Sequence, residues 1–138
     1  MRVKKERQKE LQQIDALRKE LHLQQTDKEQ EIEELGKHVQ AFEQKIQDIN
    51  AKAKNLESKQ INVKKVDEFN ALTQEITAAE RERIAAEQKI SDLVDKRASE
   101  EELLEKIKES LKTSEASSLA LEKEIQASIK LINQEGSN

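Results

Sequence analysis

The sequence contains no cysteine, proline, tryptophan or tyrosine, and only two glycines and two phenylalanines occur among its 138 residues. Without cysteine, the chain can form neither a disulfide nor a cysteine-ligated zinc site of its own. His22 and His38 are too far apart to share a metal on one helix, where ligands lie about three or four residues apart. No glycine-rich phosphate loop and no nucleophile beside a base is present. We therefore expect no catalytic, cofactor or metal site within this chain.

Long apolar runs are missing as well. No run approaches the roughly 20 residues that a helix needs to cross a bilayer. The basic first residues, 1–9, lack the apolar core of a signal peptide. These features predict a cytoplasmic protein without a membrane span. The net charge of −4 argues mildly against a general nucleic-acid binder.

What the sequence does contain is charge and a heptad pattern. Charged residues make up 39% of the chain and hydrophobic residues 34%, which is typical of long helices when Ala, Glu, Lys and Leu recur with this period. Apolar residues in the first half alternate steps of three and four, as a coiled-coil seam requires. They are Ile32, Leu35, Val39, Phe42, Ile46, Ile49, Ala53 and Leu56. The pattern returns after a break at Phe69, Leu72, Ile76, Ala79, Ala86, Ile90 and Leu93.

The two halves match in reverse, because paired positions keep a constant sum of residue numbers. Leu56 then faces Phe69, Ala53 faces Leu72, Ile49 faces Ile76 and Leu35 faces Ile90. This regularity predicts an all-α fold, a long two-helix antiparallel coiled-coil hairpin, and leaves its oligomeric state open. We expect one domain over 1–135, with a helix at about 1–60, a turn at about 61–66, a helix at about 67–135, and the start of a linker at 136–138.

The predicted turn lacks glycine and proline. Asn62 tolerates the left-handed region and is expected to end the first helix there. Asp67 is expected to cap the second helix, with Glu68 favourably placed on the helix dipole.

Polar residues interrupt the seam on both helices. The same frame places Lys28 opposite Arg97 and Gln25 opposite Glu100. Buried polar residues in a seam commonly fix register and orientation at a cost in stability, which we favour over a catalytic role for this cluster. We expect these four residues to set the register.

Three further predictions follow from the same frame. Phe42 should pack opposite Arg83, with a cation-π contact. The seam should continue through Leu17 with one irregular step. Ser114, Ser118 and Ser128 should make the open end of the hairpin looser.

The turn end is basic. Lys52, Lys54, Lys59, Lys64 and Lys65 stand there against Glu57 alone, while the middle of the hairpin is acidic. Apolar residues at the turn can simply close the hairpin, and lysines can simply keep it soluble. The contrast in charge favours a partner-contact surface, because an acidic partner would be steered to this end. Its expected residues are Lys59, Ile61, Val63, Lys64, Lys65, Val66 and Glu68.

The segment from Val63 to Ile76 resembles the tip of a bacterial family of coiled-coil hairpins followed by a zinc ribbon. The matching features are the acidic-aromatic pair Glu68-Phe69, then Ala71-Leu72, then Glu75-Ile76. The likeness is greatest to the chlamydial member. The resemblance implies an adaptor or chaperone that binds the nitrogen-type alternative sigma factor and components of flagellar or type III secretion export.

The resemblance also implies zinc in a C-terminal ribbon, whose paired cysteines are absent from this chain. Two other functions remain open. One is a nucleic-acid-associated protein in which the hairpin is a spacer for that ribbon. The other is a structural rod, such as a parallel homodimer.

Overall fold

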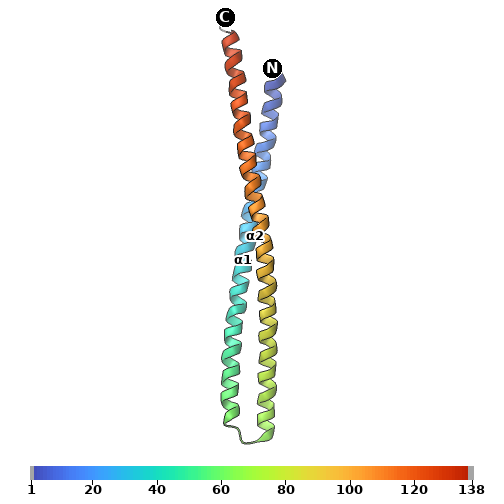
Figure 1. Ribbon diagram of the computed structural model, residues 1–138, viewed down its shortest axis with the longest axis vertical. Helices are drawn as coiled ribbons and strands as arrows, with labels where there is room; N and C mark the ends of the chain where they lie inside the picture. The colour runs from blue at the N-terminus through green and yellow to red at the C-terminus, as the bar shows by residue number, and fades with distance from the viewer. Residues whose placement is uncertain (1, 137–138) are drawn as a thin grey trace. The chain divides into compact units, whose positions relative to one another are not determined.

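The computed structural model describes residues 2–136, with side chains from residue 5 to residue 133. It contains two helices, α1 (Arg2–Ile61) and α2 (Val66–Gly136), joined by residues 62–65. The helices run in opposite directions on either side of this connection (Figure 1). The predicted all-α antiparallel hairpin is therefore confirmed. Residues 137 and 138 of the expected linker lie outside the described residues.

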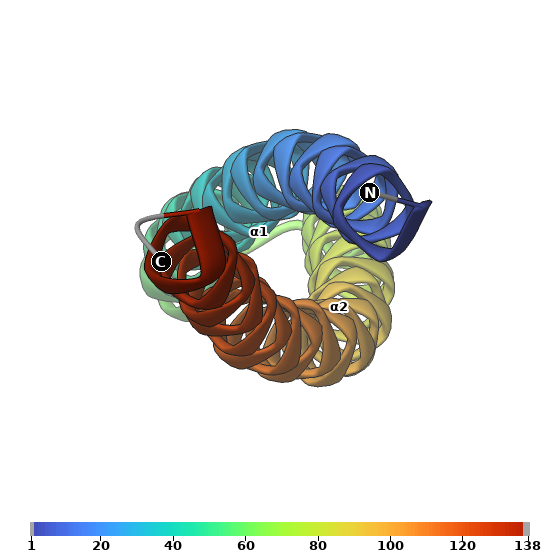
Figure 2. The same ribbon diagram turned by 90° about the horizontal axis from the view of Figure 1, so that it is seen from above.

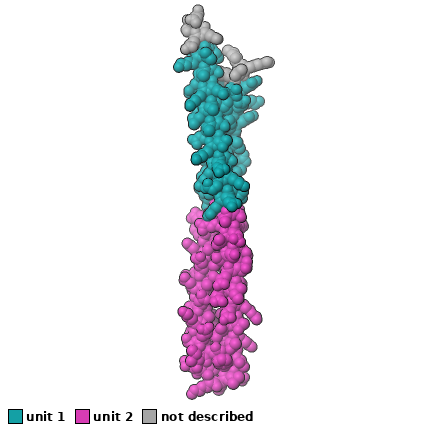
Figure 3. All heavy atoms as spheres, in the orientation of Figure 1, with its two compact units in different colours: residues 1–30, 101–138 teal, residues 31–100 magenta. Residues whose placement is uncertain are grey.

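The chain divides into two compact units (Figure 3). Unit 1 comprises residues 1–30 and 101–138, so it holds the first half of α1 and the second half of α2. The start of α1 and the end of α2 belong to this unit and face the viewer in Figure 2. Unit 2 comprises residues 31–100 and contains the turn.

The helices follow from composition and period. With no proline to remove a backbone donor, nothing in the sequence breaks a long helix except the turn. The least exposed positions recur in steps of three and four along both helices, and these are the a and d positions of the heptad. In unit 2 they include Leu35, Ile49 and Leu56 at d, each 7% to 8% exposed. The flanking e and g positions border the seam.

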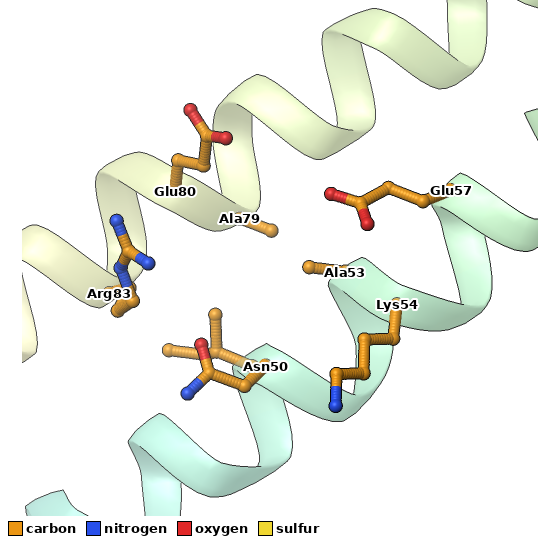
Figure 4. Close-up of a pocket in the computed structure, with 8 residues that line it drawn as sticks. Asn50, Ala53, Lys54, Glu57, Ala79, Glu80 and Arg83 are labelled. Atoms are coloured by element: carbon orange, nitrogen blue, oxygen red, sulfur yellow. The ribbon is translucent and has the colours of Figure 1, made fainter.

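The register of the hairpin differs from the predicted one by a whole heptad. Ala53 and Ala79 line one hollow and point toward each other (Figure 4), whereas the sequence frame paired Ala53 with Leu72. At the turn, Gln60 Nε2 donates to Thr73 Oγ1 at 2.6 Å and to the Phe69 carbonyl at 3.3 Å. A shift of seven residues keeps every a and d position in the seam, so the period alone cannot distinguish the two registers.

The shift also changes the polar layers. Lys28 shares a hollow with Leu103 and Ile107 in unit 1, one heptad away from its predicted partner. Arg97 lies over Gly36 in unit 2, where a Cβ built on the glycine would be 3.4 Å from Arg97 Nη1. The predicted layer of Lys28 with Arg97 is therefore wrong. It would have placed two cations opposite each other, which is unfavourable.

The second predicted polar layer is wrong for the same reason. Gln25 Nε2 donates to Glu29 Oε1 on its own helix at 3.0 Å. Glu100 borders a hollow in unit 2 with Leu35 and Leu93. The role of these polar residues in setting the register stays a prediction.

In unit 1, the predicted irregular step at Leu17 and the predicted loosening by Ser114 and Ser118 are both wrong. Arg18, half-buried, keeps the strict three-four step, and Leu17 is 50% exposed beside the seam. Ser114 and Ser118 are buried, at 7% and 3% exposure. Ser118 Oγ donates to Asp15 Oδ1 across the two helices at 3.4 Å. Small hydroxyl side chains therefore bring the helices together here rather than loosening them.

Phe42 has a different cation from the expected one. Lys45 Nζ lies 6.0 Å from the centroid of the Phe42 ring, at the limit of a cation-π contact. Arg83 Nε instead lies 3.8 Å from Glu87 Oε1 on its own helix, because the register shift moves Arg83 next to Ile49 and Ala53.

Candidate partner-binding site at the hairpin tip

The first helix ends in a tightened turn. The backbone N–H of Asn62 donates to the Lys59 carbonyl at 3.2 Å, and that of Val63 donates to the Gln60 carbonyl at 3.3 Å. The Asn62 side chain reaches the Ser58 carbonyl at 3.5 Å. These contacts satisfy carbonyls that a helix end leaves without intrahelical donors. Asn62 does follow the last helical residue, but no described non-glycine residue has positive φ, so the expected left-handed conformation is wrong.

The second helix begins one residue earlier than predicted. The Phe69 N–H donates to the Lys65 carbonyl at 3.0 Å, which makes Lys65 the N-cap residue and Val66 the first helical residue. Asp67 therefore lies inside the first turn and is not the cap. Asp67 and Glu68 still stabilise this end through the helix dipole.

Apolar side chains at the tip are exposed. Ile61 is 83% exposed, Val66 72% and Phe69 46%, while the buried leucines of the seam lie below 10%. The sequence frame had placed Phe69 in the seam opposite Leu56, so its exposure was missed. Covering one such side chain is worth about 1.5–3 kcal/mol. The tip can therefore gain substantial free energy from a partner.

A hollow of about 580 Å³ lies beside these residues. Apolar groups of Val63, Ala71 and Leu72 contribute to its lining, together with the charged side chains of Lys59 and Lys64. The remaining lining residues are Asn62 and Glu68.

The structure thus divides the predicted tip residues into two groups. Lys59, Val63, Lys64 and Glu68 line the hollow. Ile61, Lys65 and Val66 are exposed outside its lining. Both groups belong to the end of α1, the connection and the first turn of α2. That they form a partner-contact surface stays a prediction.

Two other kinds of site are absent from the described residues. Within residues 2–136, no three His, Asp or Glu side chains are arranged to hold a metal ion. In the same part of the chain, neither helix contains a stretch apolar enough to cross a bilayer.

The comparisons with known proteins are informative for the fold. The chain is similar to a solved structure of CT398 from Chlamydia trachomatis, with 50% sequence identity and a TM-score of 0.85. The match covers 99% of this chain and 58% of that one. No family model matches the chain. No curated protein matches it either.

Proposed function

We propose that this chain is a non-enzymatic interaction module, an adaptor or chaperone that presents the tip of its hairpin to partner proteins in the cytoplasm. The observation that carries the proposal is the exposure of Ile61 and Val66 beside a hollow whose lining includes Lys59 and Lys64. Exposed apolar side chains rimmed by charge are typical of protein contact sites. The lysines would steer an acidic partner and the apolar residues would hold it.

The partners we propose come from the resemblance of the segment 63–76. They are the nitrogen-type alternative sigma factor and components of flagellar or type III secretion export. We further propose that zinc, if the protein uses it, is held by a ribbon outside this chain.

The test is binding of purified nitrogen-type sigma factor and of export components to immobilised protein. The triple variant Lys59→Glu, Lys64→Glu, Lys65→Glu should associate at least about tenfold more slowly at low salt and lose most of its salt dependence, since steering acts on association. The double variant Ile61→Ser, Val66→Ser should instead dissociate faster.

A matched control separates the tip from general charge. Lys112, Lys123 and Lys130 are exposed lysines of unit 1, and their reversal to Glu changes the net charge by the same amount. Equal slowing by both triple variants would place the contact away from the tip. Unchanged binding in the tip variants would refute the proposal.

A further inference from the structure

Unit 1 has one flank that differs from the rest of the hairpin, on the side opposite to its e positions. Two hollows lie along this flank, and both are lined by Lys106 and Ser110. One of about 640 Å³ includes Ile14 and Leu17, and the other of about 330 Å³ includes Leu21. Because the two hollows share residues, they form one continuous groove between α1 and α2. We call it the g-flank groove.

The groove is bordered by g positions without charge. Between Ile14 and Lys28 of α1, and between Leu103 and Ser117 of α2, every g position is neutral: Leu17, Gln24, Leu103, Ser110 and Ser117. The g positions of a coiled coil that faces water are often Glu or Lys. In unit 2 they are charged except for His38: Glu31, Lys45, Lys52, Lys59, Glu68, Glu75, Glu82, Lys89 and Lys96.

The e positions of the same stretch of unit 1 behave normally. Asp15, Lys108 and Glu115 are charged and exposed, and the fourth e position is His22, also exposed. The e flank of unit 2 is mixed, with Gly36, Asn50, Thr73 and Val94 among its neutral positions, but only the g flank of unit 1 carries a neutral residue at every position of the stretch. Leu17 and Leu103 on this flank are 50% and 43% exposed, an arrangement that free solvation does not favour.

Two hydroxyls of the groove are already hydrogen-bonded within α2. Thr113 Oγ1 donates to the Glu109 carbonyl at 3.1 Å, and Ser114 Oγ donates to the Leu111 carbonyl at 2.8 Å. Covering these two hydroxyls with apolar atoms therefore leaves neither donor unsatisfied. The hydroxyls of Ser110 and Ser117, which also line the groove, are on exposed residues. Small side chains at these positions also leave room for large ones from another molecule.

We propose that the g-flank groove binds an amphipathic helix of a partner protein and thereby becomes a three-helix bundle. The α1 wall runs from Ile14 to Lys28, about 21 Å at roughly 1.5 Å per residue, which suits about four turns of a helix. Such a helix carries large apolar residues at a and d. It carries a Glu or Asp at its middle, because Lys106 lines both hollows and Lys28 lines one of them, against the single carboxylate of Glu109.

A second copy of this chain fits the groove less well. In a twofold association each copy would present the same lining to the other, with Lys28 and Lys106 against Glu109 alone, since an isologous interface uses the same patch on both subunits. Like charges facing each other oppose that contact. The charge of the groove thus favours a different molecule with a central carboxylate. The proposal is independent of the function proposed for the tip.

The experiment uses the whole chain and a fluorescent synthetic helix of about 18 residues, with Leu at a and d and Glu at its middle. Binding is followed by fluorescence anisotropy. The comparison peptides are a scrambled sequence and the same helix with Lys in place of the central Glu. We expect the Glu helix to bind about tenfold more tightly than the Lys helix, with no binding of the scrambled peptide.

Two exposed leucines of α1 provide matched variants. Leu17→Glu introduces a charge into the groove, whereas Leu23→Glu changes a leucine that is 67% exposed at an f position. Leu17→Glu should weaken binding at least about tenfold, because it replaces an apolar contact by a desolvated carboxylate and competes with the peptide's Glu for Lys106, and Leu23→Glu should bind like the wild type. Equal affinity of the two variants would overturn the proposal.

If Leu17→Glu loses helicity, a second pair decides. Ser110→Phe fills the groove from an exposed position, and Ala116→Phe places the same ring on the outer face. If Ser110→Phe binds the Glu helix as tightly as the wild type does, the proposal that this groove is the binding site is wrong. Sedimentation of the wild type without peptide tests whether the chain associates with itself. If it does, and if Leu17→Glu or Ser110→Phe abolishes the self-association, the groove binds a second copy of the chain. That result would overturn the assignment to a partner helix.

Discussion

Units 1 and 2 are built from the same two helices and the same heptad, yet they use the seam differently. In unit 2, the buried seam residues are all apolar, as at Leu56, Ile49 and Ala79, and the half-buried Arg83 is a charged seam residue among them. In unit 1, the seam includes Arg18, Gln25 and Lys28, and its most buried residue is Ser118. A heptad therefore specifies pairing in both units but does not specify how much apolar area each buries. The first unit keeps an uncharged flank, and the second keeps an exposed apolar tip.

The largest expected effect tests the register on which this comparison rests. Ala53→Cys with Ala79→Cys should cross-link in dilute protein, because the two alanines point toward each other across one hollow and a disulfide or short bismaleimide needs close Cβ atoms. Ala53→Cys with Leu72→Cys, the pair of the sequence frame, lies about 10 Å further along the axis and should not. Mobility on a non-reducing gel measures both. Efficient cross-linking of the second pair alone would restore the sequence frame.

The next effect compares the two seams directly. Leu56→Ala in unit 2 should lower the free energy of unfolding by about 2–3 kcal/mol, since it leaves a cavity among apolar neighbours. Leu21→Ala in unit 1 should cost less, about 1–2 kcal/mol, because Leu21 already borders an open hollow that water can enter. Urea unfolding followed by circular dichroism gives both values, with the exposed Leu23→Ala as the control. A larger loss for Leu21→Ala would reverse the ranking of the units.

The polar seam residues of unit 1 are expected to lower the stability of the protein and to restrict it to one register and one oligomeric state. Gln25→Leu with Lys28→Leu should raise the free energy of unfolding by about 1–2 kcal/mol and add higher oligomers, as apolar replacements of buried polar groups commonly do. Thermal unfolding and sedimentation check the two parts. A destabilised double variant that stays a single species would show that these residues do not set the register.

The smallest effect is expected in unit 2 at Gly36. Gly36→Ala should stabilise the protein by about 0.5 kcal/mol, because glycine in a helix is about 1 kcal/mol less favourable than alanine and the new Cβ meets only the flexible end of Arg97 at 3.4 Å. Ala41→Gly, at an exposed position of the same unit, measures how much the difference in helix propensity between alanine and glycine contributes by itself. A loss of melting temperature in Gly36→Ala would mean that Arg97 cannot move and that the close approach itself is required.

The sequence by itself determined the helices, the turn and the composition of the seam. Period 3.5 identifies the buried face wherever it is apolar, and the break at residues 61–66 marks the reversal. The same reading found the lysines and most apolar residues of the tip, because the turn between two seams has no seam residue to cover them.

Only the tertiary structure decided which heptad faces which. A seven-residue shift conserves every a and d position, so the choice rests on contacts that no period contains, such as Gln60 with Thr73 and Arg97 over Gly36. That choice exposed Phe69 and separated Lys28 from Arg97. It also placed Ser114 and Ser118 inside unit 1, because small side chains are buried wherever the opposing helix comes close, whatever their polarity.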